Sequence, residues 1–332
     1  MRILVTAVGA ELGQAVVKAL RLSDFPVECY GCDMQEDNAG IAFVTQFFCV
    51  PPARNREKYL QALDDICRLL SIDIVVPASE PEIDVLSEVE ALPCGSSVLC
   101  QPASWINIYG DKLKCMEALA GCVELARFAD GADSAAVERL LLSAGYPLVV
   151  KPRHGSGSTG VAVVEDDEQL AIALKKIRKP MIQEYIDSKL GEYSVGVFVC
   201  EYFQSMICFV RELGQGGASW IAETVHDEEV LGYVHQIATA SKAQGSINVQ
   251  VRKSSRGVRL LEINARFSSL VAARAVGGFR DLDWSIELLM GRVPKKPSEP
   301  LRHVRFRRFI HEVIDIGDGY GAVAAWTPRM SV

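Results

Sequence analysis

The chain has 332 residues, a formal net charge of −7 and 49% hydrophobic residues, so it is long enough for two or three domains and a sizeable core. Its apolar runs are strand-sized, well short of the roughly 18 residues that a membrane span needs. The chain starts directly in a strand, without a signal-peptide pattern. The negative charge argues against a general nucleic-acid binder. We therefore expect a cytoplasmic protein with neither a membrane nor a nucleic-acid partner.

Ten cysteines are scattered along the chain, many of them inside apolar runs, which fits reduced thiols in the cytoplasm. Cys29 and Cys32 form one C-x-x-C motif, but no second pair completes a zinc site. We expect these two cysteines to be packing residues on a strand and at its end.

Residues 1 to about 105 alternate strands and helices, which is the pattern of a parallel α/β sheet. The expected strands lie at 3–7, 27–33, 46–50, 72–77 and 97–100, and the expected helices at 13–22 and 56–70.

After residue 105 the pattern is first mixed and then rich in strands. The expected helices lie at 111–119, 134–144, 167–176, about 227–240 and 282–290. The expected strands lie at 148–151, 161–164, 181–185, 193–200, 205–211, 247–252 and 259–264. Residues 294–300 are rich in Pro and Lys, so we expect a linker there.

The most informative segment is 260–266, L-L-E-I-N-A-R. Glu262 and Asn264 are two residues apart, so they project from one face of a strand. A carboxylate and an amide followed by Arg266 form a hard-oxygen site beside a cation, which suits Mg²⁺ holding a polyphosphate.

A second segment, 148–160, is a strand that ends in Lys151 and continues into a glycine-rich loop. The loop lies between two strands and not before a helix, so it is neither a Walker loop nor a dinucleotide fingerprint. The loop could close over phosphates, or it could be a mobile hairpin with a solvated lysine. When this segment is taken alone, neither interpretation is favoured over the other. The candidate phosphate-binding residues of the loop are His154, Gly155, Ser156, Gly157, Ser158, Thr159 and Gly160.

Two further segments are weaker candidates when each is taken alone. An apolar strand that continues into a linker carries Gln183, Glu184, Tyr185 and Ile186; its backbone could meet an adenine, and Glu192 could accept ribose hydroxyls. Taken alone, an ordinary strand with surface acids is the favoured interpretation. Asp111 is a good N-cap, and Lys112 would be in the first helical turn, where it is either solvated or held by an anion; taken alone, the solvated interpretation is favoured.

The order of these segments resembles the ATP-grasp superfamily over about residues 108–290, and residues 1–105 resemble the α/β domain that usually precedes that fold. The resemblance implies an open parallel α/β domain at 1–107. It also implies a two-subdomain ATP-grasp fold of α+β type, with a small subdomain carrying the glycine-rich loop at 108–186. A large subdomain with the metal site and a C-terminal extension would occupy 187–332.

Within the superfamily the chain is most similar to one unit of the carbamoyl phosphate synthetase large subunit, because Gln250, Glu262, Asn264 and Arg266 match its metal-binding set. The resemblance implies two Mg²⁺ ions, for which Mn²⁺ can substitute, with Glu262 bridging both and Gln250 and Asn264 taking one each. The chain has room for one such unit only, so we expect a single-unit relative that does not make carbamoyl phosphate.

The resemblance implies a ligase that joins a carboxylic acid to an amine through an acyl phosphate and releases ADP and phosphate. Lys112, Lys151 and Arg266 would stabilise the transferring phosphoryl group, with Lys151 and Arg266 as catalytic residues. Two alternatives remain: an ATP-binding regulator without turnover, and a nicotinamide-dependent oxidoreductase, supported only by Asp33 at the end of a strand. The expected partners are a small acid and a small amine, and a homodimer is left open.

Two other clusters are weighed against the site. Arg305 and Arg307 could hold a substrate carboxylate, but a solvated edge strand is favoured. Glu80, Glu82 and Asp84 follow a strand end where ligands bind in open α/β sheets, yet a solvated helix N-terminus is the favoured interpretation.

Overall fold

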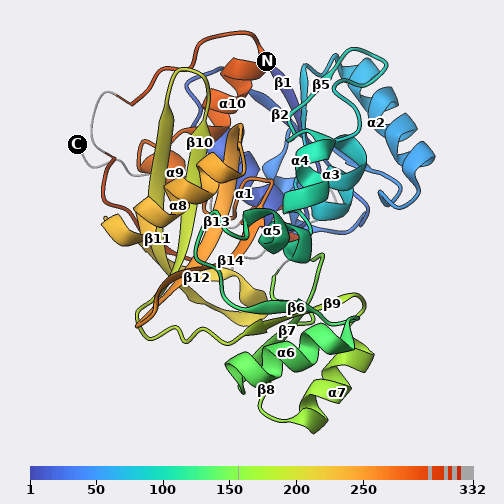
Figure 1. Ribbon diagram of the computed structural model, residues 1–332. Helices are drawn as coiled ribbons and strands as arrows, with labels where there is room; N and C mark the ends of the chain where they lie inside the picture. The colour runs from blue at the N-terminus through green and yellow to red at the C-terminus, as the bar shows by residue number, and fades with distance from the viewer. Residues whose placement is uncertain (156, 298–300, 310–312, 316–319, 323–332) are drawn as a thin grey trace.

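The computed structural model describes residues 1–155, 157–297, 301–309, 313–315 and 320–322 (Figure 1). These residues form a five-stranded, a four-stranded and a six-stranded sheet. A further, two-stranded antiparallel sheet consists of β16 (Val313–Asp315) and β17 (Tyr320–Ala322). No helix within these ranges is long and apolar enough to cross a membrane.

The five-stranded sheet is parallel and has the order β3-β2-β1-β4-β5. Ile3 and Val5 belong to the core on the side of α1, whereas Leu4 belongs to the core on the side of α2, so helices cover both faces. This arrangement confirms the predicted parallel α/β fold class. Its elements are β1 (Arg2–Val5), α1 (Glu11–Leu20), β2 (Glu28–Asp33), η1 (Ala39–Phe43), β3 (Phe47–Cys49), α2 (Arg56–Leu70), β4 (Ile74–Val76), α3 (Glu80–Leu86), β5 (Ser97–Val98) and α4 (Ala103–Tyr109).

The four-stranded sheet is antiparallel, with the order β6-β9-β7-β8, and lies at the bottom of Figure 1 with α6 and α7. Both helices begin at an aspartate cap, since Asp133 accepts from the backbone N–H of Ala136 and Asp166 from that of Gln169. The elements of this part are α5 (Lys112–Leu119), β6 (Phe128–Asp130), α6 (Ser134–Ala144), β7 (Leu148–Pro152), β8 (Ala162–Val164), α7 (Asp167–Lys176) and β9 (Pro180–Glu184).

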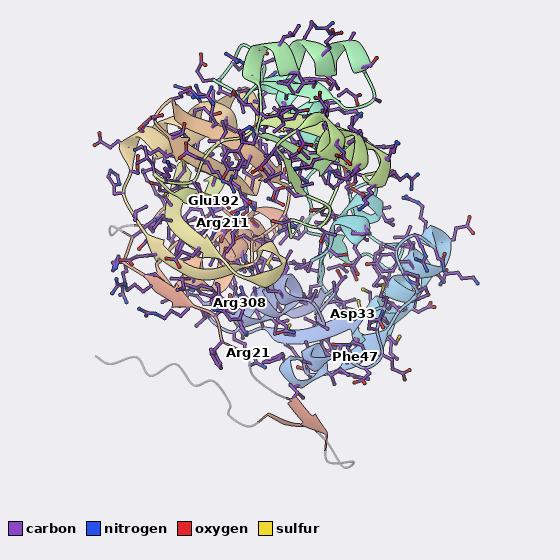
Figure 2. All side chains as sticks on the ribbon, turned by 90° about the horizontal axis from the view of Figure 1, so that it is seen from below. Arg21, Asp33, Phe47, Glu192, Arg211 and Arg308 are labelled. Carbon is purple, nitrogen blue, oxygen red and sulfur yellow. The ribbon has the colours of Figure 1, made fainter. Side chains whose placement is uncertain are left out.

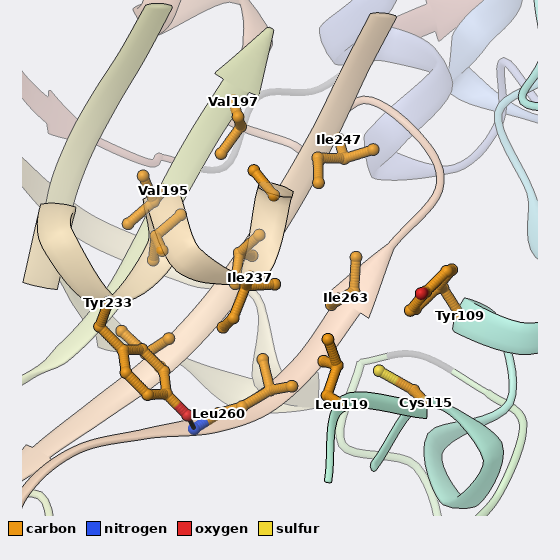
Figure 3. Close-up of a cluster of buried hydrophobic side chains, with 14 of the residues drawn as sticks. Tyr109, Cys115, Leu119, Val195, Val197, Tyr233, Ile237, Ile247, Leu260 and Ile263 are labelled. Carbon is orange, nitrogen blue, oxygen red and sulfur yellow. Dashed lines mark hydrogen bonds between the residues drawn. The ribbon is translucent and has the colours of Figure 1, made fainter. Parts of the chain in front are cut away.

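The six-stranded sheet is also antiparallel, with the order β14-β13-β10-β11-β12-β15. One face packs Val195, Ile247 and Ile263 against α5 and α8, as Figure 3 shows. Alternation along each strand therefore turns the polar residues to the opposite face. The elements are β10 (Glu192–Val199), β11 (Gln204–Leu213), η2 (Gln215–Gly217), β12 (Ser219–Thr224), α8 (Glu228–Ala240), β13 (Gly245–Ser254), β14 (Gly257–Asn264), α9 (Val271–Val276), α10 (Asp281–Leu289) and β15 (Arg305–Arg307).

The last two helices of this part return to the first sheet. Val271 of α9 and Ile286 of α10 pack in the same core as Ile3 of β1. The chain after β14 therefore runs beside the N-terminal sheet, which sets one wall of the site described below.

The bounds predicted for α2, α6 and α7 are confirmed. The helix predicted at 13–22 begins at Glu11 and ends at Leu20, because extended Ala10 provides no side-chain cap that would mark its start. The sequence pattern does not predict α4, β6, β12 or α9, since segments of three to seven residues carry little periodicity. A domain boundary between 107 and 108 would divide α4, and the three domain ranges stay predictions.

All ten cysteines are free, and Cys29 and Cys32 are buried on β2, as expected of packing residues. Of the predicted linker at 294–300, positions 298–300 lie outside the described residues.

Leu260 on β14 is fully buried in the core beneath α8. Leu260→Ala removes apolar contacts and leaves a cavity, so it should lower the free energy of unfolding by about 2–5 kcal/mol in urea titrations. Leu142→Ala is the control, because Leu142 is 83% exposed on α6 and its loss should change stability by less than about 0.5 kcal/mol. Equal losses in the two variants would contradict this core assignment.

Candidate functional site

A cavity of about 930 Å³ lies where the two antiparallel sheets meet the carboxyl ends of β1 and β4. All the predicted site residues that the structure describes line this cavity except Gly160 and Asn264, and Ser156 lies outside the described residues. The lining set is Lys112, Lys151, His154, Gly155, Gly157, Ser158, Thr159, Gln183, Glu184, Tyr185, Ile186, Glu192, Gln250, Glu262 and Arg266.

Lys151 is buried at the end of β7 and connects the two sheets. Its Nζ donates to Oε1 of Gln183 on β9 at 2.7 Å and to the backbone oxygen of Leu261 on β14 at 3.0 Å. Burial lowers the pKa of the Lys151 ammonium to about 8, against the opposing pull of the Glu262 carboxylate. The lysine is therefore not a solvated side chain of a mobile hairpin.

Lys112 is in the first turn of α5, and its Nζ lies 3.3 Å from Oε2 of Glu262 and donates to the backbone oxygen of Gly155 at 2.6 Å. The solvated interpretation, which is favoured for this segment taken alone, is therefore wrong: the Lys112 side chain is only 12% exposed and lies against the Glu262 carboxylate. Asp111 caps the helix as predicted, accepting from the N–H groups of Leu113 and Lys114. Asp111 also accepts from Arg153, so the start of the glycine-rich loop is tied to the start of α5.

The glycine-rich loop uses glycine where the backbone has a positive φ, which is +121° at Gly155, +65° at Gly157 and +74° at Gly160. It approaches the turn between β11 and β12, where a Cβ on Gly217 would lie 2.4 Å from Oγ of Ser158. Gly160 supports the turn without reaching the cavity wall.

Glu262, Asn264 and Gln250 lie on the polar face of β13 and β14, where Gln250 is opposite Glu262. Burial raises the pKa of Glu262, but the positive charge of Lys112, the hydrogen bond from Asn264 and the charges of Lys151 and Arg266 outweigh burial and hold the pKa below its usual value. Asn264 donates from Nδ2 to Oε1 of Glu262 at 3.2 Å, which leaves its amide oxygen as an acceptor. An ionised carboxylate beside an amide oxygen fits Mg²⁺.

Gln250 differs from the other two, because its Oε1 already accepts a hydrogen bond from Nη2 of Arg211 at 2.5 Å. The same Nη2 of Arg211 also donates to Oε1 of Glu192 at 2.7 Å. The other carboxylate oxygen of Glu192 accepts from Nε of Arg252, also at 2.7 Å. The proposed ribose acceptor is thus held by two guanidinium groups, and its role with ribose stays a prediction. Figure 2 shows Glu192 and Arg211 side by side.

The segment predicted to meet the adenine has its backbone along the cavity. The side chain of Gln183 is committed to Lys151, and Glu184 accepts from Arg256 and from the backbone of Arg127. The backbone of Tyr185 and Ile186 and the adjoining side chains remain the candidates for recognition of a base.

The acidic cluster after β4 begins α3, as expected, but it is only partly solvated. Glu80 lines the cavity, accepts from the N–H of Gly155 at 3.1 Å and lies 3.7 Å from Nη2 of Arg266. Glu82 is buried and accepts from the hydroxyls of Thr6 and Ser79, so the solvated interpretation is wrong for this residue.

Arg305 and Arg307 lie on β15, at the edge of the six-stranded sheet and away from the cavity lining. Arg305 is exposed and pairs with Glu223, so the favoured edge-strand interpretation is confirmed.

The sequence analysis missed several cavity residues, chiefly Arg211, Arg252 and Asn248, and it favoured a solvated position for Glu80, which lines the cavity. Strand alternation could have placed Asn248 and Arg252 on the face of Gln250, because they are two residues away on either side. Arg211 gives no such signal, since its position beside Glu192 depends on how β10 pairs with β11.

A parallel α/β sheet followed by two antiparallel sheets with a cavity between them is the architecture of an ATP-grasp protein. Residues 176–311 match the family described as "ATP-grasp in the biosynthetic pathway with Ter operon", and residues 3–93 match the "PylC-like, N-terminal domain". The chain therefore has the ATP-grasp fold.

A formate-dependent phosphoribosylglycinamide formyltransferase from Prochlorococcus marinus (strain NATL2A) is 25% identical over 193 residues, which make up 54% of this chain and 46% of that protein. The chain thus spans about half the length of the curated relatives it matches.

Two solved structures share the fold. Biotin carboxylase from Campylobacter jejuni, in its β-γ-ATP complex, has a TM-score of 0.71 and 17% identity over 89% of this chain and 72% of that one. N5-carboxyaminoimidazole synthetase from Staphylococcus aureus, complexed with ADP, has a TM-score of 0.70 and 15% identity over 91% of this chain and 80% of that one. At identities of 15–17%, the structural similarity establishes a shared fold and nothing further.

The lowered pKa of Lys151 predicts a pH-dependent stability. Below about pH 8 both the folded and the unfolded state keep the proton. Between about pH 8 and the ordinary value of 10.5 only the unfolded state keeps it, so the free energy of unfolding rises with pH over this range. Relative to Lys151→Met, the wild type should therefore gain about 2 kcal/mol between pH 7.5 and 9.5 in urea titrations. A difference between the two proteins that is constant with pH would contradict the lowered pKa.

Proposed function

We propose that the protein is an ATP-dependent ligase that joins a carboxylic acid to an amine through an acyl phosphate and releases ADP and phosphate. The observation that carries this proposal is the gathering of three cations, Lys112, Lys151 and Arg266, around the carboxylate of Glu262 in one cavity. Such a set suits the negative charge that develops when a carboxylate attacks a γ-phosphate. The enzyme would act in the cytoplasm on small molecules.

Each part of the cavity has a role in this proposal. Lys151 and Arg266 stabilise the phosphoryl group in transfer, and Lys112 adds a third cation. The segment from Gln183, at the end of β9, to Ile186 holds the base, and Glu192 faces the ribose. The glycine-rich loop closes over the phosphates and keeps water from the acyl phosphate, which hydrolyses readily.

The residues fit a magnesium ion at Glu262 and Asn264, and that ion, when bound, would neutralise phosphate charge. We propose that Mn²⁺ can replace Mg²⁺ at this site. The resemblance implies a second ion bridged by Glu262 and held by Gln250, but Arg211 already donates to the amide oxygen of Gln250.

The oxidoreductase alternative has little support in the first sheet. Asp33, the one residue that supports this alternative, accepts from the backbone N–H groups of Gly9 and Gln35, both at 2.9 Å. Its carboxylate thus stabilises the loop after β1. A regulator without turnover differs from the ligase only in activity, so the assay below decides between them.

The test is ADP release measured against a matrix of small acids and amines, with mass detection of the product. With ¹⁸O in the carboxylate of the productive acid, one label should appear in the released phosphate, because that oxygen attacks phosphorus and leaves with it. Recovery of AMP, or of unlabelled phosphate in a productive reaction, would overturn the acyl-phosphate route.

The metal assignment predicts a graded loss among variants. Glu262→Gln should lower kcat by roughly 10²-fold or more at saturating Mg²⁺, because it removes the one carboxylate of the set. Asn264→Ala should lose less, because it removes a neutral ligand. Steady-state kinetics across a Mg²⁺ titration measure both, and a Glu262→Gln enzyme with the wild-type kcat would show that the metal lies elsewhere.

A further inference from the structure

Arg211 lies at the centre of the polar face of the six-stranded sheet, between a carboxylate and an amide. Its Nη2 is 2.7 Å from Oε1 of Glu192 and 2.5 Å from Oε1 of Gln250. The side chain is only 8% exposed, yet the residue lines the cavity. A guanidinium is therefore fixed against the position that the resemblance gives to a metal ligand.

The chemistry of the contact fixes the orientation of Gln250. Arginine has donors only, so the atom of Gln250 that faces it is the amide oxygen. A metal ion at Gln250 would need the same oxygen and would lie against a guanidinium. Two cations sharing one neutral ligand in a partly buried site repel each other strongly. The residues at Gln250 therefore do not fit a second ion.

The local charges lead to the same conclusion. Glu192 forms ion pairs with both Arg211 and Arg252, so its single negative charge neutralises only one of these two positive charges. Lys112 and Lys151 lie near the single carboxylate of Glu262. Within this group of six residues, four cations thus face two carboxylates without any metal.

Arg211 also retains a donor for a ligand. Its Nε is buried and has no hydrogen-bond partner among the described residues, and Nη1 reaches only Oγ of Ser219 at 3.4 Å. Buried donors are nearly always paired, so an unpaired one at a cavity wall points to an acceptor that arrives with the ligand. The oxygens of a polyphosphate are such acceptors.

We propose that Arg211 is a nucleotide-binding residue that takes the place of a second magnesium ion. Its guanidinium supplies the positive charge at Gln250, and one divalent ion, at Glu262 and Asn264, completes the charge balance of the polyphosphate. This inference rests on the proposed function for the identity of the nucleotide. It also accounts for a neutral residue at Gln250, since an acid there would form an ion pair with Arg211 and cancel its charge.

The test counts ions and measures nucleotide affinity without turnover. Mn²⁺ bound per chain is counted by electron paramagnetic resonance with a non-hydrolysable ATP analogue, and the affinity for the analogue is measured calorimetrically with Mg²⁺ and, separately, with EDTA. The wild type should bind one Mn²⁺ per chain. Arg211→Met should weaken metal-free binding by about tenfold or more, and Arg211→Lys should recover most of it.

Arg259→Met is the matched control, because Arg259 is also a strand arginine, with a 15% exposed side chain and a carboxylate neighbour, but lies outside the cavity lining. It should leave both measurements unchanged. Circular dichroism checks that each variant is folded. If Arg211→Met does not fold, the Mn²⁺ count of the wild type and the affinity of Arg211→Lys are still measured. Two Mn²⁺ per wild-type chain, or equal affinities of wild type and Arg211→Met, would overturn the inference. Failure of the ligase proposal is seen separately, as a lack of ADP formation by an enzyme that binds the analogue.

Discussion

The burial of a charged lysine at the junction of two sheets is the constraint on which the site depends. The ammonium of Lys151 comes from β7, and its hydrogen-bond partners are Gln183 on β9 and the backbone of Leu261 on β14. A buried cation without partners is costly, so the four-stranded sheet cannot separate from the six-stranded sheet without exposing or neutralising this charge. Beside it, Lys112 lies 3.3 Å from Glu262 and donates to the backbone oxygen of Gly155, which ties the glycine-rich loop to this carboxylate. Sheet packing and the electrostatics of the cavity thus have one origin.

The sequence predicted those parts of the site that lie within one strand or loop. Glu262 and Asn264 could be found because alternation places them on one face, and Lys151 because it ends an apolar strand before a glycine-rich loop. Arg211 could not be found in this way. Its role follows from the register of β10 against β11, which brings it beside Glu192, and from the pairing of β10 with β13, which brings it to Gln250. Register between strands far apart in the sequence is set by packing and is not visible in a local pattern.

The acids of α3 show the same limit on a smaller scale. Three carboxylates within five residues look equivalent in the sequence, and a helix N-terminus explains them all. In the fold, Glu80 meets the glycine-rich loop, Glu82 is buried under Thr6, and Asp84 is exposed at the cavity rim. Burial raises the pKa of Glu82, whereas Glu80 lies beside Arg266. The orientation of α3 relative to the cavity therefore determines which of these acids lines it. The composition of the first helical turn does not.

The polar face of the six-stranded sheet is held in place by a second buried ion pair behind the cavity. Arg274 of α9 is completely buried, pairs with Asp281 and donates to the amide oxygen of Asn248, which leaves Nδ2 of Asn248 buried without a partner among the described residues. Gly196 makes this possible, since a Cβ there would lie 2.6 Å from Cζ of Arg274. Replacing the pair with apolar residues would be the simpler way to stabilise a sheet. Its presence instead fixes the orientation of Asn248 at the cavity wall, so the helices that dock on the N-terminal sheet also position a donor in the site.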